Sequence, residues 1–164
     1  MARWRDTRRV RAALASVWFG ASLGVAALGA PSVFAVLPGP QAGPIVGRML
    51  EREATLGVVL GALLILLEHL RSRARAEAGL PGPRFSAELL LALGAVFCTV
   101  AGHHALLPWM EQARAGRGPL TFGQLHAISV AFYAVKMGLV GTLAWRALGA
   151  LSAGEGRLPS ASGA

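Results

Sequence analysis

The sequence predicts an all-α integral membrane protein, a bundle of four transmembrane helices with both termini in the cytoplasm. Of its 164 residues, 54% are hydrophobic, and the mean hydropathy is +0.54. The 16 Lys and Arg and the 8 Asp and Glu residues gather mostly between long uncharged stretches, unlike the dispersed charges of a soluble domain. We divide the chain into a basic N-terminal segment (1–11), a transmembrane domain (12–150) and a flexible Gly-, Ser- and Ala-rich tail (151–164).

The first transmembrane helix is expected over residues 12–36. No charge occurs between Ala12 and Gly47, and 25 helical residues suffice to cross a hydrocarbon core of about 30 Å. The motif Leu37-Pro-Gly-Pro40 then ends the helix. A cleaved signal peptide is the alternative, because it also places an apolar run after basic residues. Here the run is about twice the usual length and leads into more apolar sequence, which favours a retained span.

The second helix is expected over residues 45–67, with Pro44 suited to its first turn. Its charge-free part, residues 54–67, is short enough to fit a buried helix instead of a span. The first half adds four charged residues: Arg48, Glu51, Arg52 and Glu53. Because Arg48 and Arg52 are four residues apart, they share a face and can extend toward the membrane surface. We therefore predict a span with an amphipathic first half.

The third and fourth helices are expected over residues 87–110 and 122–148. Ser86 can cap the third helix. Thr121 and Gln124 have the spacing of a capping box at the start of the fourth. Both helices are apolar over enough residues to cross a bilayer.

The distribution of Arg and Lys predicts the orientation. The two terminal flanks and the loop between the second and third helices hold 11 of these residues, whereas the other two loops hold 4. Cytoplasmic loops carry the excess of basic residues, so both termini are expected inside. Basic residues at the ends of apolar runs favour a lipid bilayer over nucleic acid as the partner. The Ala-, Gly- and Arg-rich composition is typical of GC-rich bacterial genomes, so we expect an inner-membrane location.

Polar residues inside the expected spans are the candidate functional residues, because they are costly in hydrocarbon. Tyr133 and Lys136 share one face of the fourth helix, and Thr99 lies on a polar face of the third. An exposed Lys at mid-span costs about 2.5–3.5 kcal/mol. Lys136 is therefore expected to face the bundle or an aqueous cavity, in a proton or ion pathway or as a packing residue. Glu68 and Glu88 are expected near the cytoplasmic surface, too far in depth to pair with it.

The histidines suggest a metal or haem site as an alternative function. His103, His104, His126 and Glu53 are all expected near the outer membrane surface. Imidazoles and carboxylates bind zinc, copper or haem iron, so His126 and Glu53 with His103 or His104 form the candidate ligand set. However, adjacent histidines point about 100° apart on a helix, and Cys98 is the single cysteine. We expect no cofactor, with haem or a transition metal as the alternative.

Glycines mark surfaces where helices can approach closely. Gly20 with Gly24, and Gly57 with Gly61, are small-xxx-small pairs. They predict contacts within one bundle or an interface with a second copy or another membrane protein. Because the chain has no phosphate loop, nucleophile elbow or paired catalytic carboxylates, we do not expect an enzyme.

Short motifs follow one another along the chain. They are Trp18-Phe-Gly20, Ala30-Pro31-Ser-Val-Phe34, Pro108-Trp-Met110 with Arg114, and Phe122-Gly-Gln-Leu-His126-Ala-Ile-Ser129. Their order resembles the transmembrane protein 205-like family of four-helix membrane proteins, over residues 17–148. The resemblance implies the family-motif residues Trp18, Gly20, Pro31, Phe34, His126 and Ser129. Relatives commonly place Asn a few residues after that Ser, a position where this chain has Phe132-Tyr-Ala-Val-Lys136.

The members of this family are largely uncharacterised, so the resemblance supports the architecture more than an activity. We expect a multi-pass inner-membrane protein that serves as a small transport or accessory component. The alternatives are a metal- or haem-binding membrane protein and a structural partner of another membrane protein.

Overall fold

The structure is a computed structural model that describes residues 2–81 and 85–155. Every element in these ranges is helical, and four segments are long and apolar enough to cross a membrane: Asp6–Val36, Gly39–Glu77, Ala87–Arg114 and Phe122–Ser152. This confirms the predicted fold class. The elements are α1 (Ala2–Leu23), η1 (Gly24–Gly29), α2 (Ala30–Val36), α3 (Gly39–Glu77), α4 (Ala87–Thr99), η2 (Val100–Ala105), α5 (Leu107–Arg114) and α6 (Phe122–Glu155).

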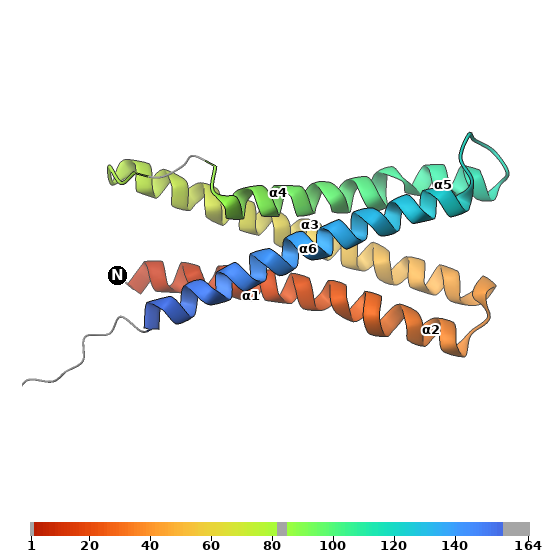
Figure 1. Cartoon of the computed structure of the whole chain (residues 1–164), viewed down its shortest axis with the longest axis horizontal. Helices are drawn as coiled ribbons and strands as arrows, with labels where there is room; N and C mark the ends of the chain where they lie inside the picture. Colours follow the sequence, from red (N-terminus) through yellow and green to blue (C-terminus); the bar gives the residue numbers. More distant parts are fainter. Residues whose placement is uncertain (1, 82–84, 156–164) are drawn as a thin grey trace, which may run out of the picture.

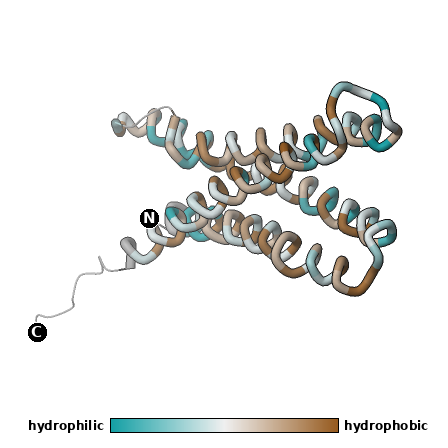
Figure 2. Tube along the Cα trace, turned by 45° about the vertical axis from the view of Figure 1, so that its right-hand side comes forward, coloured by the Kyte–Doolittle hydropathy of each residue, from teal (hydrophilic) through white to brown (hydrophobic). Residues whose placement is uncertain are grey.

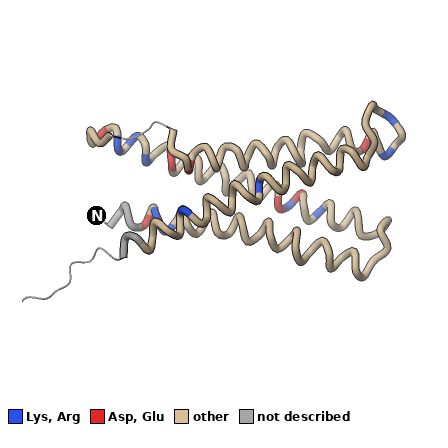
Figure 3. Tube along the Cα trace, viewed as in Figure 1, with Lys and Arg blue, Asp and Glu red and all other residues tan. Residues whose placement is uncertain are grey.

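The four spans form one bundle with two distinct ends (Figure 1). The start of α1, the end of α3 and the end of α6 lie together, and we call this the terminal end. The α2–α3 and α5–α6 connections lie at the opposite end, which we call the far end. Within the described residues the backbones of α3 and α6 each lie close to those of α1 and α4 but not to each other, so the two helices occupy opposite corners and meet only through side chains. Hydrophobic residues dominate the length between the ends (Figure 2), and most charged positions lie near the ends (Figure 3).

Several helices extend beyond their predicted bounds. α3 begins at Gly39 rather than at residue 45. Pro40 occupies the first turn, where an N–H donor is not needed, so Pro44 lies inside the helix instead of in its first turn. The basic N-terminal segment is helical from Ala2. α6 continues to residue 155, so the start of the predicted flexible tail is helical, and residues 156–164 lie outside the described ranges.

Two π-helical segments interrupt the first and third spans, and each precedes a proline. η1 leads to Pro31 in the first turn of α2, and η2 leads to Pro108 in the first turn of α5. A proline lacks an N–H donor, and its ring clashes with the carbonyl four residues earlier in a regular α-helix. A wider turn relieves this clash: the N–H of Ala30 donates to the carbonyl of Val25, five residues back. Both spans therefore widen locally on the far-end side of the bundle.

The predicted caps are present. The N–H of Leu89 donates to Ser86 Oγ at 3.2 Å. Thr121 and Gln124 form the reciprocal capping box, with backbone-to-side-chain distances of 2.9 and 3.3 Å. These bonds satisfy N–H groups that a helix start otherwise leaves without a partner. They fix where the third and fourth spans begin.

Ion pairs connect the spans at the terminal end. The buried side chains of Arg11 in α1 and Glu68 in α3 form one pair. Arg146 in α6 donates to Glu88 in α4 at 2.9 Å, and this pair is partly exposed. Glu68 and Glu88 therefore both lie at the terminal end, each with an arginine from another span.

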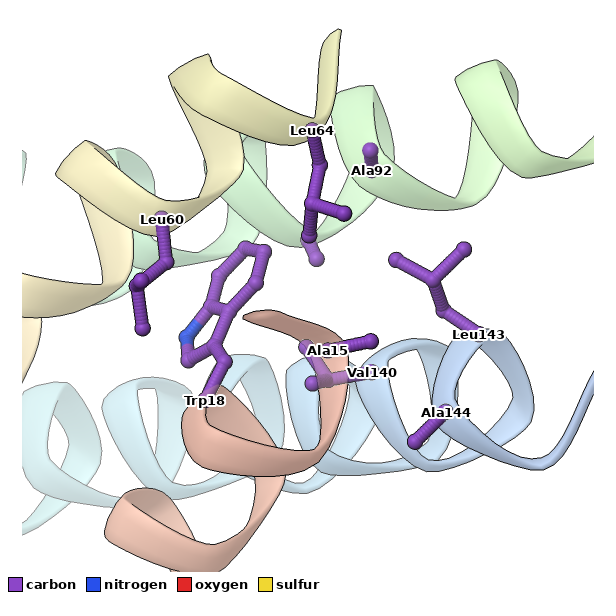
Figure 4. Close-up of a cluster of buried hydrophobic side chains, with 9 residues drawn as sticks. Ala15, Trp18, Leu60, Leu64, Ala92, Val140, Leu143 and Ala144 are labelled. Atoms are coloured by element: carbon purple, nitrogen blue, oxygen red, sulfur yellow. The ribbon is translucent and has the colours of Figure 1, made fainter. Parts of the chain in front are cut away.

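An apolar core lies between the terminal end and the middle of the bundle. It is formed by buried side chains from all four spans: Ala15, Trp18, Leu60, Leu64, Ala92, Ala95, Val140, Leu143 and Ala144 (Figure 4). The Trp18 indole lies against α3, where a Cβ atom on Gly57 would be 2.7 Å from its Nε1. Gly57 and Gly61 are thus used for contacts within the bundle, whereas a Cβ on Gly20 or Gly24 would meet nothing within 4 Å.

Candidate functional site: a buried ion pair beside a polar cavity

An ion pair joins α3 and α6 inside the bundle. Lys136 Nζ donates to both carboxylate oxygens of Glu53, at 2.8 Å each. The two residues are 2% and 5% exposed, respectively. Because α3 and α6 occupy opposite corners, the pair crosses the centre of the bundle.

Ser22 and Tyr133 hold the pair in position. Ser22 Oγ donates a short hydrogen bond to Glu53 Oε1, so the carboxylate accepts three hydrogen bonds in all. The Tyr133 hydroxyl donates to the Ser22 carbonyl at 2.7 Å, and its ring centroid lies 3.9 Å from Lys136 Nζ. Charge-assisted hydrogen bonds and a cation–π contact therefore satisfy both charges. The four side chains belong to three different spans.

The pair lies deep between the two ends of the bundle. Ser22, Glu53 and Lys136 are each 14 residues from the far-end limit of their spans, at Val36, Gly39 and Phe122. At about 1.5 Å per residue this is about 21 Å along each helix. A lone charge is costly at such a depth in a membrane, and a paired, hydrogen-bonded charge is the arrangement that tolerates it.

A cavity of about 40 Å³ adjoins the pair. Its lining includes Glu53, Lys136, Thr99, His103 and Ser129. One water molecule requires about 10–15 Å³ of such volume, so the cavity has room for about three. The Nε2 atom of His103 is buried and has no hydrogen-bond partner in the described part of the chain. A polar cavity with an unsatisfied imidazole nitrogen is suited to hydrogen-bonded water.

The remaining polar groups of the cavity are bonded to backbone. Thr99 Oγ1 donates to the Ala95 carbonyl at 2.9 Å, within its own span. Ser129 Oγ donates to the carbonyl of Gly102 in η2 at 2.7 Å, which connects α6 with the widened turn. The intramembrane polar residues predicted from sequence, Thr99, Tyr133 and Lys136, thus all line this one cavity.

The pairing of Glu53 with Lys136 is not predicted by the sequence. With a helix start at residue 45, Glu53 is expected near the outer membrane surface, far in depth from Lys136. The actual start at Gly39 moves Glu53 six residues deeper into its span. The available signal was helical periodicity, because Glu53 lies four and eight residues before Gly57 and Gly61 and so shares their buried face.

The structure does not assemble the predicted metal ligands His103, His126 and Glu53. His103 lines the cavity, but His126 is exposed and stacks on the Phe122 ring at 5.8 Å between centroids. The ring of His104 is exposed and meets His103 edge-on, and Glu53 is bonded to Lys136. Across residues 2–81 and 85–155 no group of three His, Cys, Asp or Glu side chains could hold a metal ion. Glu53 and His103 line the same cavity, and the predicted set is incomplete because His126 lies on the exposed side of α6.

The family-motif residues have different environments. Trp18 is fully buried in the core, and Ser129 bonds to the Gly102 carbonyl. Gly20, Pro31, Phe34 and His126 are exposed or half-buried on the sides of the bundle. Two of the six residues thus have a clear structural role in helix packing.

Comparison with known proteins identifies one family. A family model described as a domain of unknown function (DUF4149) matches residues 13–119. The matched region includes Ser22, Glu53 and Thr99, and it ends just before α6, which supplies Lys136. No curated protein and no solved structure matches the chain.

Proposed function

Because the chain belongs to the DUF4149 family of uncharacterised domains, we propose its function from the site: a non-enzymatic, small transport or accessory component with a proton pathway through Glu53 and Lys136. The observation that carries this proposal is the buried ion pair beside a polar cavity. Ionisable residues inside membrane spans are characteristic of ion and proton pathways. A pair kept only for stability is a weaker explanation, because apolar residues of similar volume usually stabilise as well or better.

The two sides of the pair differ in polarity. On the far-end side of the pair, the lining of the cavity includes His103 and Ser129. Toward the terminal end, the spans are filled by the apolar core around Trp18 (Figure 4). In this conformation protons reach the pair from the far end, and passage to the terminal end requires movement of the apolar core.

The proton step uses groups already in contact. A proton that enters through water beside His103 binds the Glu53 carboxylate, which then loses its charge. The neutral carboxyl attracts the Lys136 ammonium less strongly, so the bond between α3 and α6 weakens. Release of the proton restores the pair. Protonation thereby changes the contact between opposite corners of the bundle.

Proton flux into vesicles tests the proposal. Purified protein is reconstituted into liposomes that contain a pH-sensitive dye, and a membrane potential is imposed. We expect flux above that of protein-free liposomes, a loss of about tenfold or more in Glu53→Gln, and a reduced flux in His103→Gln, which leaves the pair intact.

The matched control for this assay is Glu88→Gln, which removes a carboxylate from a partly exposed ion pair at the terminal end. It should retain wild-type flux. Wild-type flux equal to that of empty liposomes would contradict the proposal, as would full flux in a folded Glu53→Gln variant.

We further propose that the terminal end faces the cytoplasm of a bacterial inner membrane, because the terminal flanks and the segment between the second and third spans hold 11 basic residues in the sequence, against 4 in the other two connecting segments. A topology reporter that is active only in the cytoplasm should work when fused after Ala164. A reporter active only outside should work when inserted next to Gly116, in the α5–α6 connection. The opposite pattern would reverse the orientation and with it the side from which protons enter.

We also propose that the chain is related to the transmembrane protein 205-like family, on the basis of the motifs around Trp18 and His126. The buried position of Trp18 and the bond from Ser129 to η2 support it, because both residues position helices. An alignment of whole chains that contain this domain, extended past residue 119 into α6, should match Trp18 and Ser129 with that family's motifs. A different residue pattern at those positions would reject the relationship.

A further inference from the structure

A second and larger cavity opens on the side of the bundle between α1–η1 and α3. Its volume is about 480 Å³, and its lining includes Ala21, Val25, Met49 and Leu56 together with Arg48 and Arg52. The cavity is shallow and faces outward, so in a membrane it is a groove that faces lipid. We call it the arginine groove.

The two arginines of this groove have no counter-charge. Arg48 and Arg52 are exposed, and no carboxylate lies within ion-pair distance of either guanidinium in the part of the chain that the structure describes. Glu51 is exposed on α3 but is not among the residues that line the groove. Glu53 does line the groove, and its carboxylate is paired with Lys136, so the groove keeps a net positive charge.

Both arginines lie in the far-end half of α3. Arg48 and Arg52 follow the α3 start by 9 and 13 residues, which is about 14 and 20 Å of helix, so Arg52 is one residue nearer the far end than Glu53. Their long side chains can extend toward the far-end surface, because arginines inside a span direct their charges toward the headgroup level. The apolar lining then continues below the charges, toward the middle of the bundle.

We propose that the arginine groove binds an anionic phospholipid of the far-end leaflet. Arg48 and Arg52 bind the phosphate, because guanidinium groups form bidentate, charge-assisted hydrogen bonds with phosphate oxygens. One acyl chain lies in the groove against Val25, Met49 and Leu56. The proposal rests on the charge complementarity between two unpaired arginines and an anionic headgroup, and on the apolar surface directly beneath them.

Lipid retention measured by native mass spectrometry tests this site. Full-length protein is taken from nanodiscs of phosphatidylglycerol or phosphatidylcholine into detergent, and bound lipid is counted. We expect wild-type protein to retain phosphatidylglycerol in preference to phosphatidylcholine. The double variant Arg48→Gln/Arg52→Gln should retain about tenfold less of it.

Two further variants distinguish a lipid site from a general charge effect. Arg114→Gln/Arg117→Gln removes two charges from the same end but outside the groove, and it should retain the wild-type amount of lipid. Ala21→Phe fills the apolar part of the groove and should lower retention while both arginines remain. Equal retention of both lipids, unchanged retention in Arg48→Gln/Arg52→Gln, or a second copy of the chain in place of lipid would each overturn the proposal.

Discussion

Replacing Lys136 with Met is expected to lower the free energy of unfolding by about 3–5 kcal/mol. The substitution preserves the volume of the side chain but leaves the Glu53 carboxylate buried, with one hydrogen bond from Ser22 in place of three. An uncompensated charge in the interior is the costly element, because among the described residues Lys136 is the cation that pairs with Glu53. Unfolding in mixed detergent micelles, followed by circular dichroism, measures the effect.

The double variant Glu53→Gln/Lys136→Met should recover most of this loss, since it removes both charges together. Arg146→Met is the matched control, because it breaks a partly exposed pair with Glu88 at the terminal end. Exposed pairs contribute about 0–1 kcal/mol, so the control should differ little from wild type. If Lys136→Met were as stable as the Arg146 variant, the pair would not be buried as the structure describes.

Stability and function can be separated with the same variants. A double variant that folds as well as wild type but carries no proton flux would show that the charges are kept for transport. Apolar residues could hold α3 and α6 together at least as well, so stability does not explain why two ionisable groups meet at mid-membrane. The additional bonds from Ser22 and Tyr133 restrict the pair to one geometry, which a proton-binding site requires and a packing contact does not.

The span count could be predicted from sequence because it depends on local properties. The length of the apolar stretches predicts the first, third and fourth helices, and the capping side chains of Ser86 and Thr121 predict where the third and fourth helices begin. Lys136 could be assigned to the interior on energetic grounds alone. All of these inferences use residues within one helix, where spacing in sequence converts directly into position.

The partner of Lys136 required information that one helix does not contain. Whether Glu53 meets Lys136 depends on the relative depth of two helices that are not even neighbours in the bundle. A predicted helix start that is six residues too late places Glu53 about 9 Å nearer the membrane surface than it lies in the structure. The two π-helical segments also change the depth of the residues that follow them in the first and third spans. The direction of a side chain around its helix is a second unknown: of the predicted ligands His103, His126 and Glu53, the structure brings His103 and Glu53 to one cavity but leaves His126 exposed.

Replacing Trp18 with Ala should destabilise the bundle by about 3–5 kcal/mol. Trp18 is fully buried at the centre of the apolar core, and its indole packs against Gly57 and Gly61 of α3. In lipid, association of helices depends on such close packing, because apolar burial between helices gains little over contact with acyl chains. The substitution leaves a cavity that the glycines have no side chains to fill.

The chain provides a matched control in Trp145, which is 81% exposed on α6. Trp145→Ala removes the same side chain from a lipid-facing position and should change stability by less than about 1 kcal/mol. The difference between the two variants in micelle unfolding isolates the packing contribution. Because the same core separates the ion pair from the terminal end, a Trp18→Ala variant that still folds should also pass protons faster than wild type. Equal stability of the two tryptophan variants would contradict the packing of α1 against α3, which closes one side of the proposed proton pathway.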